Sequence, residues 1–292
     1  MKFEHIRVMN FENAIRGMRH PKLSYHLSDS LFGIDSFEYC DVDYTVAERW
    51  CDYLNGGPVA DSALTTQEIE EQINELDKWL VENGVLHHCG DFFEYAFIGP
   101  QDLDLMQKLI KGGPEHRKFM RQIFVSVDIT APLYWWKEFD TYKVGTVANS
   151  TSTMHKMASK PITIDCFEID DHQDYCTFLS DFLGEEGLTA DDCESMIVRF
   201  IDFLEGLRLK YLETKDKKYW KELIRWLPES WLQTRTVTMN YENLLAMCSK
   251  GQRRYHKLNE WSGIDCPENE NFVKMCRTLP YAQELLFLDE LD

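Results

Sequence analysis

Hydrophobic residues recur at helical spacing in two stretches of the first half of the chain. Thr65 with a glutamate three positions later has the spacing of a capping box, and apolar residues then follow at helical intervals up to Leu80. A second amphipathic helix is predicted over 102–110, ended by the Gly-Gly-Pro at 112–114. Residues 92–98 between the two predict a short strand.

A clear alternation occupies the middle of the chain. Most apolar residues of 119–129 share one parity, which predicts a strand with one face buried. Pro132 follows where a helix can begin, since a missing N–H costs nothing at the first turn. The pattern then predicts a helix over 133–142 and a polar, hydroxyl-rich loop over 149–153.

The second half is predicted to be mainly helical. The spacing of apolar residues predicts helices over 174–183, 189–212 and 219–226. A β-prone run at 235–239 separates these from a further predicted helical part, made of residues 241–248 and 268–287. Residues 1–60 are rich in turn residues and predict loops.

Length and charge narrow the class of protein. With 292 residues the chain can form one large domain or two small ones, and 44% hydrophobic residues suffice for a packed core. The net charge of −19 repels nucleic acids and anionic membranes, so no direct nucleic-acid binding is expected. An alternative is that such a surface imitates nucleic acid or binds a basic protein partner, although the acids are dispersed rather than in blocks.

Targeting features point to the cytoplasm. No apolar run approaches the roughly 20 residues that span a bilayer, and the first residues lack the apolar core of a secretory signal. Nine scattered cysteines, odd in number, are typical of reduced thiols rather than of a disulfide framework. We therefore expect a cytoplasmic protein with no membrane segment.

Two blocks of sequence carry a family resemblance. The first runs from Ile129-Thr130-Ala131-Pro132 into residues 137–143 and 149–155. The second is Leu227-Pro228, with Asn240 twelve residues after the proline. In this order, from about residue 100 to 292, the chain resembles the flavin-dependent thymidylate synthases, and residues 1–60 diverge.

The resemblance implies both a fold and a chemistry. It implies an α+β fold, a central mostly antiparallel sheet with flanking helices, in a single domain over 1–292. It also implies a homotetramer with active sites at subunit interfaces. FAD and the nucleotide dUMP would bind there, and a flavin-mediated methylation would follow.

The charged positions of the family signature are changed in this chain. The Arg-His-Arg triplet of the family falls on Thr141-Tyr142-Lys143, and its Arg-Tyr pair falls on Met154-His155. Threonine and methionine cannot grip a phosphate as the bidentate fork of a guanidinium does. We therefore expect poor dUMP affinity unless other arginines compensate, the candidates being Arg117, Arg121, Arg225, Arg253 and Arg254.

The resemblance also implies a set of site residues. The expected cofactor-binding residues are His116, Arg121, Lys143, Asn149 and Asn240. The expected substrate-binding residues are Glu138, Ser150, Ser152, His155 and Arg225, and the expected catalytic residues are Arg253 and Arg254. The alternatives are surface charge for His116 and Arg121, local turn hydrogen bonds for 149–153, and an oligomer contact for 253–257.

Other catalytic and metal-binding patterns are missing from the sequence. His87, His88, Cys89 and Asp91 have no second ligand cluster at zinc spacing, so no metal site is predicted. There is no glycine-rich phosphate loop, GxSxG or HExxH motif.

Two functions of different classes follow. The first is a flavin-dependent thymidylate synthase-like protein that binds FAD and a nucleotide, with altered flavin-mediated methylation of the nucleotide. The alternative is a catalytically inactive relative, acting as a phage or prophage binding protein that sequesters a nucleotide or inhibits a protein partner. The lost arginines and the acidic charge favour the second function.

Overall fold

The computed structural model describes residues 1–35, 93–142, 144–169 and 190–291. The helices predicted over 65–80 and 174–183, together with Lys143 and the cluster at His87–Asp91, lie outside these residues. Contacts divide the chain into two compact units. Unit 1 comprises residues 1–4 and 128–237, and unit 2 comprises residues 5–127 and 238–292. The expectation of a single domain over 1–292 stays a prediction.

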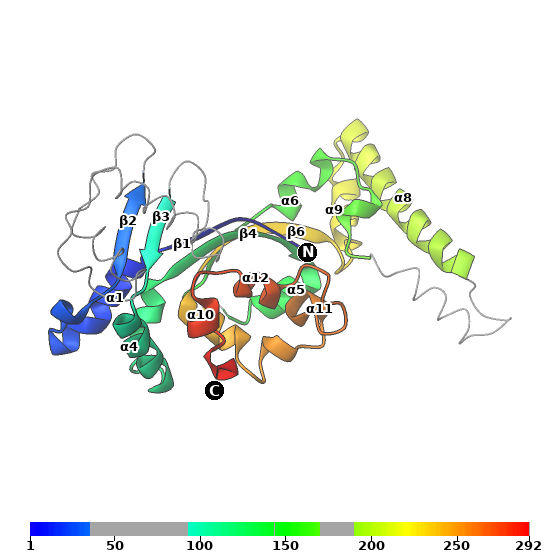
Figure 1. Ribbon diagram of the computed structural model, residues 1–292. Coiled ribbons are helices and arrows are strands. Elements are labelled where there is room, and N and C mark those ends of the chain that lie inside the picture. Colours follow the sequence, from blue (N-terminus) through cyan, green and yellow to red (C-terminus); the bar gives the residue numbers. More distant parts are fainter. Residues whose placement is uncertain (36–92, 143, 170–189, 292) are drawn as a thin grey trace, which may run out of the picture. The chain divides into compact units, whose positions relative to one another are not determined.

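The main sheet has four strands (Figure 1). In the order of the sheet they are β1 (Lys2–Met9), β4 (Phe124–Pro132), β6 (Leu232–Asn240) and β5 (Val147–Ser150). Thr130 hydrogen-bonds Thr234 through their hydroxyls, and Ser126 accepts from Thr238, so β4 and β6 run in opposite directions. The predicted α+β class, an antiparallel sheet with flanking helices, is confirmed.

Unit 2 supplies most of the short helices. Within the residues that the structure describes, its α-helices are α1 (Phe11–Arg19), α4 (Pro100–Lys111), α10 (Tyr241–Cys248), α11 (Asn259–Ser262), α12 (Phe272–Arg277) and α13 (Ala282–Leu285). Its 3₁₀ turns are His20–Lys22, Tyr25–Leu27, Lys118–Gln122, Arg253–Tyr255 and Leu288–Glu290. A separate antiparallel pair joins β2 (Leu31–Asp35) to β3 (Phe93–Phe97).

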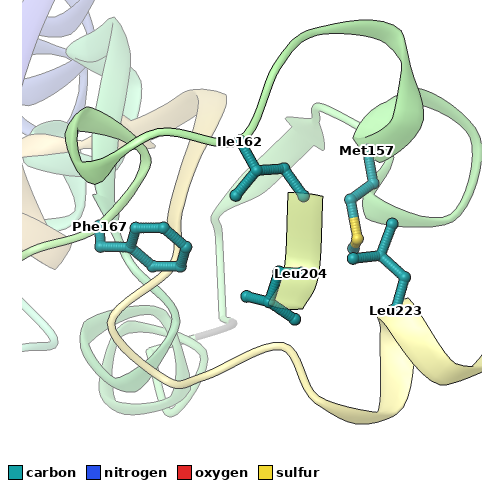
Figure 2. Close-up of a cluster of buried hydrophobic side chains, with 5 residues drawn as sticks. All are labelled: Met157, Ile162, Phe167, Leu204 and Leu223. Carbon is teal, nitrogen blue, oxygen red and sulfur yellow. The ribbon is translucent and has the colours of Figure 1, made fainter. Parts of the chain in front are cut away.

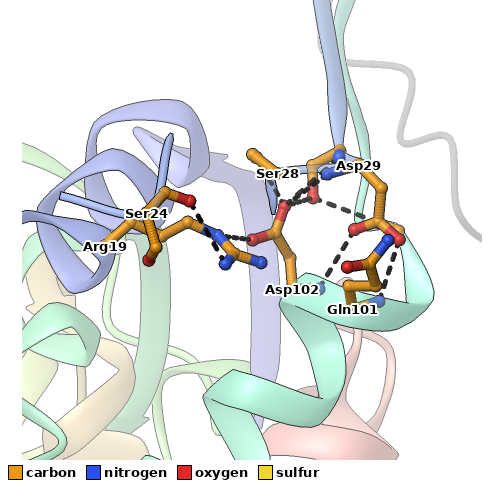
Figure 3. Close-up of polar contacts among 8 residues, drawn as sticks. Arg19, Ser24, Ser28, Asp29, Gln101 and Asp102 are labelled. Carbon is orange, nitrogen blue, oxygen red and sulfur yellow. Dashed lines mark hydrogen bonds and ion pairs between the residues drawn. The ribbon is translucent and has the colours of Figure 1, made fainter. Parts of the chain in front are cut away.

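A buried carboxylate ties together the N-terminal part of unit 2 (Figure 3). Asp102, in the first turn of α4, is fully buried and accepts from Arg19 Nε at 2.6 Å. Its other oxygen accepts from the hydroxyls of Ser28 and Ser30. Asp29 then caps α4 by accepting from the backbone N–H groups of residues 101 and 102. The charge is thus fully partnered, as burial requires.

Unit 1 packs helices around a compact apolar cluster (Figure 2). Its described helices are α5 (Leu133–Phe139), α6 (Thr153–Lys156), α8 (Ala190–Thr214) and α9 (Lys217–Arg225), with 3₁₀ turns at Met157–Ser159 and Ile164–Cys166. The cluster consists of Met157, Ile162, Phe167, Leu204 and Leu223. Leu204 from α8 and Leu223 from α9 are fully buried, so the two helices pack through these leucines.

Some boundaries differ from the sequence prediction. The strand predicted from 119 begins only at Phe124, because residues 118–122 form a 3₁₀ turn in which the adjacent Phe119 and Met120 are both buried. The loop predicted over 149–153 is wrong, since β5 ends at Ser150 and α6 begins at Thr153. The helix predicted over 268–287 is broken at Pro280, whose ring cannot continue a helix.

Other predictions agree with the described elements. The helix predicted over 241–248 coincides with α10, and the helix predicted over 102–110 lies within α4. The loop-rich description of residues 1–60 fails for the described part, which holds β1 and α1. None of the described helices is both long and apolar enough to cross a membrane.

Candidate functional site

The segment with the family resemblance, residues 141–155, lies within unit 1 and is called the signature segment below. It leaves α5, forms the edge strand β5 and ends in α6. Thr151 donates its backbone N–H to the carbonyl of Thr234 at 2.9 Å, and its own carbonyl accepts from Gln233 Nε2 at 2.9 Å. The end of β5 is therefore fixed to β6 by both backbone and side-chain bonds.

Two of the predicted site residues are presented on this strand. Asn149 and Ser150 are exposed, and neither side chain hydrogen-bonds another residue of the described chain. Local turn bonding, the alternative for this segment, therefore does not occupy these two side chains. They remain available to a ligand, with an amide and a hydroxyl as donors and acceptors.

The other predicted residues of the signature segment have more local roles. Ser152 is half-buried, and its carbonyl, directly before α6, accepts from the backbone N–H of Lys156, the last residue of that helix. Glu138 is half-buried at the end of α5, where its carbonyl accepts from the Thr141 hydroxyl at 2.7 Å. Lys143 and the side chain of His155 lie outside what the structure describes.

A polar network beside the signature segment was missed by the sequence analysis. Arg235, on β6, donates from Nη1 to Asp140 and from Nε to Gln233, both at 3.0 Å. Its guanidinium lies over the ring of Trp136 at 4.2 Å from the centroid. The indole of Trp136 in turn donates to the carbonyl of Gln233 at 2.9 Å. Sequence reasoning placed Arg235 in a strand but had no signal for these partners.

Arg225, a predicted substrate residue, lies at the end of α9 in unit 1. Its guanidinium forms an ion pair with Glu222 on the same helix, and its side chain is 56% exposed. This is the geometry of a solvated surface pair, which holds the guanidinium only weakly.

In unit 2, two candidate arginines that precede β4 donate hydrogen bonds to the same carboxylate. Arg117 and Arg121 both donate to Glu242, in the first turn of α10. Burial raises the pKa of Glu242, but hydrogen bonds from the two arginines outweigh it and hold that pKa below its usual value. His116 is exposed. Arg121 is thus partly neutralised before any ligand arrives.

Arg254, a predicted catalytic residue, is enclosed by acceptors. Its Nη1 and Nη2 donate to the two carboxylate oxygens of Asp289 at 2.9 and 2.7 Å, and Nε donates to the carbonyl of Cys248. Glu290 lies 3.2 Å from Nη1. The hydrogen bond from Arg254 lowers the pKa of Asp289 from its usual value. Such an arrangement secures the C-terminal turn to the end of α10.

The two remaining predicted residues of unit 2 also have structural contacts. The guanidinium of Arg253 lies over the ring of Trp261 at 5.2 Å from the centroid. Asn240 is the N-cap of α10, where its side chain accepts from the N–H of Asn243 and the Asn243 side chain accepts from the N–H of Asn240. This reciprocal capping box commits the amide oxygen of Asn240 to the backbone of α10.

Two groups of the predicted residues contrast most clearly. Asn149 and Ser150 of unit 1 are exposed and chemically available, whereas the unit 2 residues Arg121, Arg254 and Asn240 bond neighbouring groups. The amide of Asn149 and the hydroxyl of Ser150 suit neutral hydroxyl, carbonyl and imide groups better than a phosphate. The described residues include no group of three or more His, Cys, Asp or Glu side chains that could hold a metal ion.

Comparisons with known proteins give a match to solved structures alone. No protein-family model and no curated protein matches the chain. The flavin-dependent thymidylate synthase ThyX of Helicobacter pylori complexed with FAD and dUMP matches at 15% identity and a TM-score of 0.42, covering 65% of this chain and 84% of that one. A second structure of that enzyme with FAD and dUMP matches at 14% identity and a TM-score of 0.42, covering 76% and 92%.

A third matching structure is the UMP/dUMP methylase PolB from Streptomyces cacaoi bound with 5-Br dUMP. It is 15% identical, has a TM-score of 0.43, and covers 65% of this chain and 82% of that one. These values describe a partial likeness of the backbone path, and no residue role follows from them. The chain is similar to solved flavin-dependent thymidylate synthases, the family that its signature segment resembles.

Proposed function

We propose that this protein binds a nucleotide through the signature segment of unit 1, as a flavin-dependent thymidylate synthase-like protein. The observation that carries the proposal is the exposure of Asn149 and Ser150 on a strand that is fixed to β6. A fixed edge strand presents its side chains with little ordering cost on binding, which favours affinity.

The chemistry of these side chains suggests which part of the ligand they contact. The amide of Asn149 has both a donor and an acceptor, which complements the N–H and carbonyl of an imide edge. Uracil has such an edge, and so does the isoalloxazine ring of a flavin. The candidate ligands are therefore dUMP and FAD. Bound reduced FAD would supply the hydride, and methylenetetrahydrofolate the one-carbon unit, for methylation of the nucleotide, while the residues of this chain would bind and orient the ligands.

The first experiment is an absorbance spectrum of the purified protein, followed by FAD titration with and without dUMP. The test variant combines Asn149→Ala with Ser150→Ala. The matched control combines Asn269→Ala with Ser195→Ala, two exposed residues outside the signature segment. Loss of hydrogen bonds from two side chains is expected to weaken ligand binding by about tenfold or more in the test variant alone. Wild-type protein that binds neither ligand at high micromolar concentration would overturn the proposal.

The ion pairs of the arginines in unit 2 favour a second function. Because Arg121 and Arg254 are paired with carboxylates, this second candidate is a catalytically inactive relative, a phage or prophage binding protein that sequesters a nucleotide or inhibits a protein partner. A partner recovered by affinity purification should then bind equally well to wild-type protein and to the Arg253→Ala variant. The first proposal also includes a homotetramer and a cytoplasmic location. Light scattering of the purified protein measures the oligomeric state.

A further inference from the structure

Arg235 is held in one orientation by three neighbours within unit 1. Asp140 and Gln233 accept from Nη1 and Nε, and the ring of Trp136 supports the face of the guanidinium. The side chain of Arg235 is 16% exposed and that of Trp136 is fully buried. An arginine fixed in this way loses little side-chain freedom when it binds a further group.

The same contacts place Arg235 at the base of the signature segment. Asp140 directly precedes the segment, and Gln233 bonds the carbonyl of Thr151 at the end of β5. Arg235 is also the one arginine in the sequence of residues 140–155 and β6 together. It therefore supplies a guanidinium beside a segment whose own residues contain none.

We propose that Arg235 binds the anionic group, a phosphate, of the ligand that the signature segment recognises. The proposal rests on nucleotide binding by unit 1, as argued above. Nη2 of Arg235 makes no hydrogen bond to another residue of the described chain, so it can donate to a phosphate oxygen. Because successive side chains of a strand point to opposite faces, one of Asn149 and Ser150 would contact the base or sugar, and Arg235 would contact the phosphate.

Asp140 gives the proposal a distinctive consequence. Its carboxylate orients Arg235, but it is 43% exposed and repels an arriving phosphate. If Arg235 binds phosphate, Asp140→Asn should strengthen dUMP binding, because the repelling charge is removed while an amide oxygen can still accept from Nη1. If Arg235 only supports the fold, the same substitution should weaken binding or leave it unchanged.

The experiment compares dUMP with deoxyuridine, which lacks the phosphate, by calorimetry at low salt. Arg235→Ala is expected to weaken dUMP binding by about tenfold or more, the effect of losing a charged hydrogen bond, and to leave deoxyuridine binding unchanged. Arg235→Lys should recover part of the loss, since it keeps the charge. The control is Arg199→Ala, at an exposed arginine of α8 in the same unit that has no predicted ligand role.

The outcomes separate this inference from nucleotide binding itself. An equal loss for dUMP and deoxyuridine in Arg235→Ala, or no loss for either, would overturn the phosphate role and leave nucleotide binding intact. If the wild-type protein binds neither compound, nucleotide binding is overturned, and inorganic pyrophosphate becomes the probe for Arg235. Pyrophosphate binding that calorimetry detects in the wild type but not in Arg235→Ala would support the anion site. A wild-type protein that shows no heat of pyrophosphate binding would overturn it.

Discussion

The two units use their arginines in opposite ways. In unit 2, Arg254 is enclosed by Asp289 and Glu290, and Arg121 donates to Glu242, so carboxylates of the same chain already satisfy these cations. In unit 1, the signature segment has no arginine, and Nη2 of Arg235 on the neighbouring strand donates to none of the residues that the structure describes. Under the proposal above, an arginine of this chain can bind an anion where carboxylates of the same chain do not already enclose its guanidinium. The predictions below test this contrast between structural and available polar groups.

The largest effect is expected at Asp102. Asp102→Ala leaves the buried Arg19 and two serine hydroxyls without their acceptor, and removing one partner of a buried ion pair destabilises a protein by about 3–5 kcal/mol. Urea denaturation measures this free energy of unfolding. Asp104→Ala, which removes an exposed pair with Lys108 on the same helix, is the control and should change it by less than about 1 kcal/mol. Equal effects in the two variants would contradict a structural role for the buried carboxylate.

A similar contrast is expected along α8 in unit 1. Leu204 is fully buried in the cluster of Figure 2, and Leu209, on the same helix, is 52% exposed. Leu204→Ala should lower the free energy of unfolding by about 2–5 kcal/mol through lost burial and the cavity it leaves. Leu209→Ala should change it by about 0.5 kcal/mol or less, as usual at surface positions. A comparable loss at Leu209 would show that a further part of the protein covers this side of the helix.

The buried face of β4 was predictable from the periodicity of the sequence, but the residue at which the strand begins was not. The alternation over 119–129 correctly marked Val125, Val127 and Ile129 as buried, because burial on one face of a strand follows its period of two. The same alternation could not show that residues 118–122 form a 3₁₀ turn, since tertiary packing buries both Phe119 and Met120 there. Local pattern fixes the buried face, and packing decides where the strand begins.

The candidate site was harder to predict because its contacts join residues distant in sequence. Arg254 was expected to face a ligand, yet its partner Asp289 lies 35 residues away and no local spacing signals the pair. Arg235 and Asp140 are 95 residues apart and meet only because β6 runs beside the signature segment. Asn240 differs, since an asparagine directly before a predicted helix is a preferred N-cap, and that local signal was available.

Acid should weaken unit 2 through its paired carboxylates. The pKa values of Glu242, Asp289 and Glu290 are lower in the folded protein than their usual values, which lie near 4. Groups with a lowered folded pKa contribute stability that is complete above the unfolded pKa and is lost as pH falls through the folded pKa. Urea denaturation between pH 7 and pH 3 should therefore show stability falling below about pH 4.

The variant Glu242→Gln separates this pair from general acid sensitivity. It removes a titrating group, so it should lower stability at pH 7 and make the decline below about pH 4 shallower. Glu115→Gln, at an exposed glutamate paired with Lys118, is the control and should follow the wild-type profile. A Glu242→Gln profile parallel to that of the wild type would contradict the importance of the Arg117 and Arg121 contacts.

Asn240 separates a capping role from a ligand contact. Asn240→Ala removes the cap of α10 and should cost about 1 kcal/mol of unfolding free energy, whereas Asn240→Ser keeps a capping oxygen and should cost much less. If Asn240 contacts a cofactor, both variants should lose FAD affinity alike. If its role is capping alone, Asn240→Ser, which keeps a capping oxygen, should bind FAD with nearly the wild-type affinity.

The smallest effect is expected at Arg225, which completes the contrast between enclosed and solvated arginines. Its pair with Glu222 is exposed, and exposed pairs on one helix contribute about 0.5 kcal/mol or less, because water and salt screen the charges. Arg225→Ala should therefore leave the free energy of unfolding within about 0.5 kcal/mol of the wild type, and added salt should erase that difference. An exposed, weakly held guanidinium remains free to bind a nucleotide phosphate, so stability alone does not decide its role. A tenfold or greater loss of dUMP affinity in this stable variant would move the phosphate contact from Arg235 to Arg225, whereas unchanged affinity would identify Arg225 as a solvated surface charge.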